Sequence, residues 1–245
     1  MYFRDTILEA SNLTDPILEG LLAPLSEADI KGAISGVFEK LRRLFLRLIE
    51  FIKSKFIKKN VAEKVMEDVQ KQDIPSEKIV KKYRYYYYDL NKSEYNKIMD
   101  NISKVIRDLS NFQVVGSSNY TIGSKEYWLS AIGVHDLDSL NDTLVTKVTG
   151  KEGTAIETLN ELKARTAQIA NFITVVNKQS AHINKILGQW RDGTDLGKRT
   201  INAFNAIYST FATISKIFAQ VKAHYDHLAI NIKRDLGIST DEDNE

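Results

Sequence analysis

Residues 154–190 read TAIETLNELKARTAQIANFITVVNKQSAHINKILGQW, and residues 196–228 read LGKRTINAFNAIYSTFATISKIFAQVKAHYDHL. In the first stretch, apolar or small residues recur in steps of three or four from Ile156 to Trp190. The second stretch repeats these steps at Leu196, Thr200, Ala203, Ile207, Thr210, Ile214, Ile217, Val221, His224 and Leu228. Such alternation is typical of the seam of a left-handed coiled coil, so it predicts two helices of roughly forty residues each.

Only the short turn at residues 191–194 separates these two helices. We therefore expect an antiparallel hairpin whose helices are each about 55–60 Å long at 1.5 Å per residue. Further apolar residues, among them Ile173, Phe204, Phe211 and Phe218, widen the stripe, so other helices should pack against the hairpin. The predicted fold class is all-α: an elongated helical bundle built on a long antiparallel C-terminal helical hairpin, residues 154–238.

The rest of the chain divides into four regions. Residues 1–25 are an irregular acidic leader, and residues 239–245 are an acidic tail. Residues 26–112 form an N-terminal helical region, with an apolar stripe from Ile30 to Phe56, a second helix at 61–72 and a third helix that Ser93 should cap. Residues 113–153 read as a loop with short helices, ending in a flexible joint at 150–153, Gly-Lys-Glu-Gly.

The composition and motifs argue against an enzyme. The chain has no cysteine, which excludes disulfides and thiol chemistry. It shows no basic and apolar secretory signal, no uncharged run of eighteen apolar residues, no Walker loop and no nucleophile elbow. We therefore expect no catalytic residues, no cofactor and no small-molecule substrate. One alternative is a metal site of His224 and His227 with Glu157 and Glu161 opposite, although His224 also fits the seam.

Residues 38–59 combine large apolar residues with eight basic and two acidic ones, whereas residues 1–37 carry two basic and six acidic ones. A basic amphipathic helix of this kind can lie on an anionic membrane surface or against a nucleic-acid backbone. The same pattern also fits a core helix of a bundle whose solvated face is basic. The residues that would contact a polyanion or a membrane are Lys40, Arg42, Arg43, Arg47, Lys53, Lys55, Lys58 and Lys59.

A second unusual stretch, residues 81–88, reads KKYRYYYY. Interleaved basic and aromatic residues can bind single-stranded nucleic acid, because the cations contact phosphates while the rings stack on bases. The same tyrosines could lie at the edge of the hydrophobic core, with their rings buried and their hydroxyls in contact with water, or they could form a protein interface. The candidate patch consists of Lys81, Lys82, Arg84, Tyr85 and Tyr87.

Residues 38–57, FEKLRRLFLRLIEFIKSKFI, resemble a helix common near the start of virion proteins from large tailed phages of Gram-positive hosts. The motifs Ile-Leu-Glu-Ala at 7–10 and Ile-Leu-Glu-Gly at 17–20 are similar to sites cut by head-maturation proteases of such phages. The resemblance covers about a quarter of the chain and implies processing after Glu9 or Glu19. It also implies an internal head or other structural protein of the virion, present in the host cytoplasm during assembly.

Three functions follow as hypotheses. The first is a non-enzymatic structural or interaction protein of a phage particle, with other virion subunits as partners. The second is a membrane-active helical protein that uses the basic amphipathic helix, and the third is a nucleic-acid-binding protein.

Overall fold

The computed structural model describes residues 34–57, 60–72, 74–115, 124–189 and 195–238. In these residues the protein is mostly α-helical, with one small antiparallel sheet of two strands. The all-α prediction is therefore corrected to mostly α. The leader, including Glu9 and Glu19, the acidic tail, Lys58 and Lys59 lie outside the described residues.

The described part of the chain consists mostly of helices and strands joined by short connections. Their order and bounds are α4 Ile34–Phe56, α5 Val61–Lys71, α6 Ser76–Ile79, β1 Lys82–Leu90, α7 Lys92–Val115, α8 Lys125–Ala131, α9 Leu140–Leu144, β2 Val145–Thr154, α10 Ala155–Gln189 and α11 Asp195–Leu236. The helix predicted at 61–72 and the two long helices predicted within 154–238 are confirmed as α5, α10 and α11.

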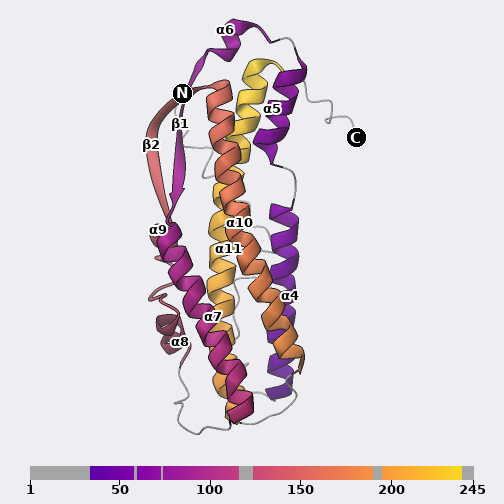
Figure 1. Cartoon of the computed structure of the whole chain (residues 1–245), viewed down its shortest axis with the longest axis vertical. Helices are drawn as coiled ribbons and strands as arrows, with labels where there is room; N and C mark the ends of the chain where they lie inside the picture. The colour runs from indigo at the N-terminus through magenta and orange to yellow at the C-terminus, as the bar shows by residue number, and fades with distance from the viewer. Residues whose placement is uncertain (1–33, 58–59, 73, 116–123, 190–194, 239–245) are drawn as a thin grey trace.

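The long helices α4, α7, α10 and α11 lie side by side along the long axis of the molecule (Figure 1). Helices α10 and α11 run in opposite directions, and α4 packs against both. Helix α5 continues beyond α4 and is tied to the same pair of helices by two ion pairs. Lys163 Nζ of α10 lies 2.7 Å from Glu63, and Lys233 Nζ of α11 lies 2.8 Å from Asp68.

Helix α11 is the central helix. Every side chain from residue 203 to residue 212, AFNAIYSTFA, is buried. A helix that is covered on all sides needs apolar or small residues all round, and this segment alternates alanines and small polar residues with three large rings. One of these rings, Tyr208, meets Phe45 of α4 edge to face at 5.5 Å. The packing surface of α11 therefore extends far beyond one narrow seam.

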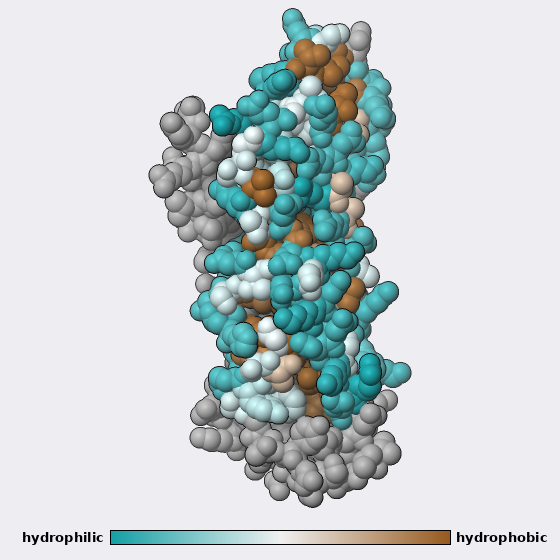
Figure 2. Space-filling model, turned by 60° about the vertical axis from the view of Figure 1, so that its left-hand side comes forward, coloured by the Kyte–Doolittle hydropathy of each residue, from teal (hydrophilic) through white to brown (hydrophobic). Residues whose placement is uncertain are grey.

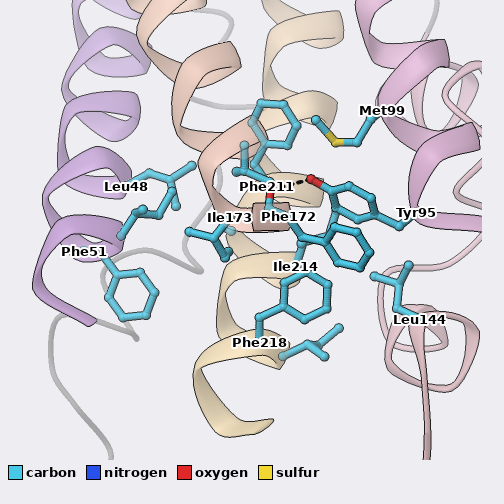
Figure 3. Close-up of a cluster of buried hydrophobic side chains, with 14 of the residues drawn as sticks. Leu48, Phe51, Tyr95, Met99, Leu144, Phe172, Ile173, Phe211, Ile214 and Phe218 are labelled. Carbon is cyan, nitrogen blue, oxygen red and sulfur yellow. Dashed lines mark hydrogen bonds between the residues drawn. The ribbon is translucent and has the colours of Figure 1, made fainter. Parts of the chain in front are cut away.

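An aromatic cluster joins α7 to the two longest helices (Figure 3). Tyr95 of α7 stacks on Phe172 of α10 with ring centroids 4.2 Å apart, and Phe218 of α11 lies 6.0 Å from Tyr95 and 5.8 Å from Phe172. The Tyr95 hydroxyl donates a hydrogen bond of 2.6 Å to the Phe172 carbonyl, so its one polar atom is satisfied inside the core.

Local capping signals fix where the helices begin. Asn91, rather than the predicted Ser93, caps α7, because its side chain accepts a hydrogen bond from the Glu94 N–H. Thr154 and Glu157 form a capping box at the start of α10: the Thr154 N–H donates to the Glu157 carboxylate at 2.8 Å, and the Glu157 N–H donates back to the Thr154 hydroxyl. This box also marks where β2 passes directly into α10.

Candidate functional site

The tyrosine-rich stretch forms β1, which pairs antiparallel with β2 to make a two-stranded ribbon. The register runs from Lys82 opposite Thr154 to Leu90 opposite Val145 and shifts by one residue between Tyr85 and Tyr87. The extra residue lies in β2, where Gly150 has a φ of 79°. A glycine in this left-handed conformation is what a β-bulge requires. The predicted flexible joint at 150–153 is thus wrong, because these residues are part of a paired strand.

The free edge of β1 is docked onto the helices by side chains. In an antiparallel pair, every second residue directs its backbone N–H and C=O away from the partner strand. The Tyr225 hydroxyl of α11 accepts from the Tyr88 N–H at 3.1 Å and donates to the Tyr88 carbonyl at 2.9 Å. His224 Nε2 lies 3.1 Å from the Tyr86 carbonyl, and because a carbonyl only accepts, this nitrogen carries the hydrogen. These contacts replace the missing neighbouring strand.

Arg165 of α10 completes this docking. Its Nη1 donates to the Tyr88 carbonyl at 3.1 Å and to Asp89 at 2.9 Å, while its Nη2 donates to Glu161 at 2.8 Å. The guanidinium carbon lies 3.6 Å from the centre of the Tyr87 ring, within the range of a cation–π contact. One partly buried arginine therefore binds the backbone, two carboxylates and a ring of the ribbon.

The rings on β1 are engaged with the protein itself. Tyr86 stacks on His224 with centroids 4.2 Å apart, and the Lys147 ammonium of β2 lies 4.0 Å from the centre of the Tyr86 ring. Tyr85 is buried, and its hydroxyl lies 3.5 Å from Glu161. The structure therefore favours core-rim packing of the tyrosines over a platform on which bases stack.

The electrostatics of the cluster follow from burial. Burial raises the pKa of Tyr85, Tyr86 and Tyr225 to about 12 each, so all three hydroxyls stay neutral near pH 7. Burial alone would raise the pKa of the Glu161 carboxyl, but the hydrogen bonds and charge of Arg165 lower it on balance. Glu161 therefore remains ionised and holds Arg165 in place.

The remaining basic residues of the candidate patch lie at the surface. Lys81 pairs with Asp235 at 3.3 Å, and Lys82 and Arg84 are exposed. The face that carries the ribbon is mainly hydrophilic, with smaller hydrophobic groups between polar ones (Figure 2).

The ribbon docking should depend on pH through His224. Burial, with the charges of Lys147 and His227, lowers the pKa of His224, although the hydrogen bond to Tyr86 opposes this. Below the ordinary histidine pKa of about 6.5, the unfolded chain takes up a proton that the folded protein resists, so the free energy of unfolding should fall as pH drops from 7 to 5.5. The slope from one proton is at most about 1.4 kcal/mol per pH unit.

Denaturant melts at several pH values measure this slope. His224→Gln should flatten it, whereas His135→Gln, at an exposed histidine outside the ribbon, should leave it unchanged. Equal slopes for wild type and His224→Gln would contradict the assignment.

The second candidate site is the exposed side of α4. Lys40, Arg42, Arg43, Arg47, Lys53 and Lys55 are all exposed. Arg42 and Arg43 both lie near Glu39, at 3.6 and 3.4 Å, but these pairs are exposed, so the arginines remain accessible to other anions. We call these six residues, with the exposed Lys178 and Lys185 of the neighbouring helix α10, the basic surface.

The α10 part of the basic surface was not predicted from the sequence. Helix α10 packs along α4, and a Cβ on its Gly188 would lie 3.8 Å from Arg42 Nε, so the two helices meet at this end. Lys178, His182 and Lys185 are exposed on α10. A sequence signal was present, because residues 162–189 contain no Asp or Glu.

The apolar side of α4 is buried in the core. Its large side chains Phe38, Leu41, Phe45, Leu48 and Phe51 are each at most 4% exposed. Helix α4 packs with this side against α10 and α11. Within the described ranges, no helix has the length and apolar character needed to cross a membrane. In this structure α4 is thus a core helix whose solvated face is basic.

The described residues contain no group of three or more His, Asp or Glu side chains placed to hold a metal ion. The residues of the alternative metal site are engaged elsewhere: His224 with Tyr86, Glu157 in the α10 capping box, and Glu161 with Arg165. A shallow depression of about 660 Å³ lies between β1 and α10, lined by Asp89, Glu157, Asn160, Glu161, Ala164, Arg165 and Gln168. Its carboxylates are those that already bind Arg165 and cap α10.

Fold and surfaces together define a mostly helical protein with a side-chain-docked β-ribbon and a basic surface on α4 and α10. Comparisons with protein families, with curated proteins and with solved structures found no match to this chain.

Proposed function

We propose that this chain is a non-enzymatic structural and interaction protein of a phage particle, held inside the head or at an assembly interface. In this proposal the scaffold is an elongated helical bundle built on the antiparallel hairpin α10–α11. The apolar seam residues, spaced as in a coiled coil, pack the two helices against each other. The observation that carries the proposal is the division of α4 into a buried apolar side and an exposed basic side.

A core helix presents its charges in a fixed arrangement. The aromatic contact of Phe45 with Tyr208 anchors α4 to the central helix, so the exposed cations keep their spacing without a partner. A surface that is ordered before binding loses less conformational entropy when a partner arrives. Such a surface suits a protein that holds a polyanion or another subunit in an assembly.

The membrane-active alternative has a higher energetic requirement. For α4 to insert, its buried phenylalanines and leucines would have to leave the core, and each buried side chain of this size contributes roughly 1.5–3 kcal/mol to folding. The intact fold could still approach an anionic membrane through charge alone. Sedimentation with phosphatidylserine vesicles separates the two modes, because insertion resists high salt and surface attraction does not.

Mass spectrometry of purified particles from the source of this chain tests the proposal. We expect peptides from α10 and α11 in the particles, together with a chain that begins at Ala10 or Gly20. The two cleavage motifs lie outside the described residues, so this second expectation rests on their sequence alone. Recovery of only the intact Met1 form would contradict processing, and absence of the chain from particles would contradict the proposed function.

A further inference from the structure

We propose that the partner of the basic surface is the phosphate backbone of nucleic acid, bound without readout of the base sequence. This inference rests on the proposed function, because it names the partner of the same exposed face. The rings of Tyr86 and Tyr87 on β1 are not available for stacking on bases, since they already pack against His224 of α11 and Arg165 of α10.

The cations of α4 are spaced along one straight helix. From Lys40 to Lys55 the helix advances about 22 Å at 1.5 Å per residue. A duplex carries one negative charge per about 1.7 Å of its axis, so a length of about 22 Å of duplex holds about 13 phosphates, and those on the side that faces the helix lie within reach of its cations. Arginine suits this contact, because its planar guanidinium donates two parallel hydrogen bonds to phosphate oxygens.

Few acidic side chains offset the positive charge around this surface. Helix α4 has only Glu39 and Glu50, residues 162–189 of α10 have no acid, and residues 196–225 of the central α11 have none either. These segments of α4, α10 and α11 are therefore electropositive, although the net charge of the chain is only +2. An uneven charge distribution of this kind attracts polyanions over a distance of about a Debye length.

The chemistry of the surface favours phosphates over bases and over a membrane. Helix α4 contains no Asn or Gln, the side chains that pair with adenine edges, so its candidate contacts come from arginines and lysines, which suit phosphate oxygens. Among the side chains described on α4 and just beyond it, the exposed large apolar ones are Leu46 and Ile57. An interfacial membrane helix needs its whole apolar side, which here is buried in the core.

Fluorescence anisotropy of the full chain with two unrelated 30-base-pair duplexes, at several salt concentrations from 50 to 300 mM, tests the inference. We expect equal affinity for the two sequences and an affinity that falls steeply with salt. Changing Arg42, Arg43 and Arg47 together to Gln should weaken binding at least about tenfold at 100 mM salt and reduce the salt slope by about 2.7, since each phosphate contact contributes about 0.9.

A matched control removes the same charge elsewhere. Lys92, Lys97 and Lys104 are exposed on α7, and their joint change to Gln should leave most of the affinity in place. The charge-conserving triple variant Arg42→Lys, Arg43→Lys, Arg47→Lys should keep the salt slope. All three triple variants alter exposed residues, so unchanged melting curves should show that the fold is intact.

Several outcomes would overturn the inference. Equal loss of affinity in the α4 and α7 variants would mean that binding depends only on the net charge of the protein and not on the basic surface. Absence of duplex binding at 50 mM salt, with binding to phosphatidylserine vesicles, would assign the surface to a membrane instead. Absence of binding to both would leave α4 as a core helix only. The particle mass spectrometry is independent of these results, so the proposed function can stand or fail separately.

Discussion

Ile214→Asp should lower the free energy of unfolding by at least about 3 kcal/mol, because it places a carboxylate in a fully buried site without a partner. Ile214 has no exposed surface and lies in the aromatic cluster of α10 and α11 with Phe172 and Phe218 (Figure 3). The sequence places it on the seam facing Phe172. For a protein of this size, such a loss corresponds to a fall in melting temperature of about 6–12 °C.

The same helix offers a matched control for this substitution. Ile230 is 49% exposed, so Ile230→Asp introduces the same charge in the same helix without burying it. Its cost should stay below about 1 kcal/mol. Urea unfolding followed by circular dichroism measures both variants. Similar losses in the two would mean that Ile214 is not part of the core.

Tyr95→Ala should cost about 3–5 kcal/mol, the range for removal of a buried aromatic ring. Tyr95 is 2% exposed, and its ring stacks on Phe172 and contacts Phe218. Through this ring α7 is joined to both α10 and α11. The cavity left by alanine would face all three helices, so it could not close by moving one side chain alone.

Tyr95→Phe separates the ring from the hydroxyl. It keeps the stacking and removes only the 2.6 Å hydrogen bond to the Phe172 carbonyl, so it should cost about 1 kcal/mol. The difference between the two variants then measures the ring. If Tyr95→Phe is as damaging as Tyr95→Ala, the hydrogen bond and not the packing attaches α7.

Local pattern was sufficient to predict the long helices. The steps of three and four residues predicted two helices within 154–238, and α10 Ala155–Gln189 and α11 Asp195–Leu236 agree with this prediction to within a few residues at all four ends. The exposed positions of Lys40, Arg42, Arg43 and Arg47 also followed from periodicity, because an amphipathic helix separates its two sides by sequence alone.

Pairing between distant segments was not predictable in this way. The pairing of β1 with β2 connects residues as distant in the sequence as Lys82 and Thr154. The local sequence of β2, which contains glycines, does not indicate which strand it pairs with. Four successive tyrosines favour a strand, but the same residues fit a helix or an interface until a partner is known. For this reason the all-α prediction missed the two-stranded ribbon, while the mostly helical class was correct.

Residue order within single helices was enough to predict the long helices α10 and α11 and the basic side of α4, because both depend on the spacing of residues in one helix. Three features came only from the folded arrangement: α11 is buried on all sides along residues 203–212, Arg165, His224 and Tyr225 dock the free edge of β1, and α10 packs along α4. These features depend on contacts between residues far apart in the chain, where packing and hydrogen-bond satisfaction, not local spacing, select the partner.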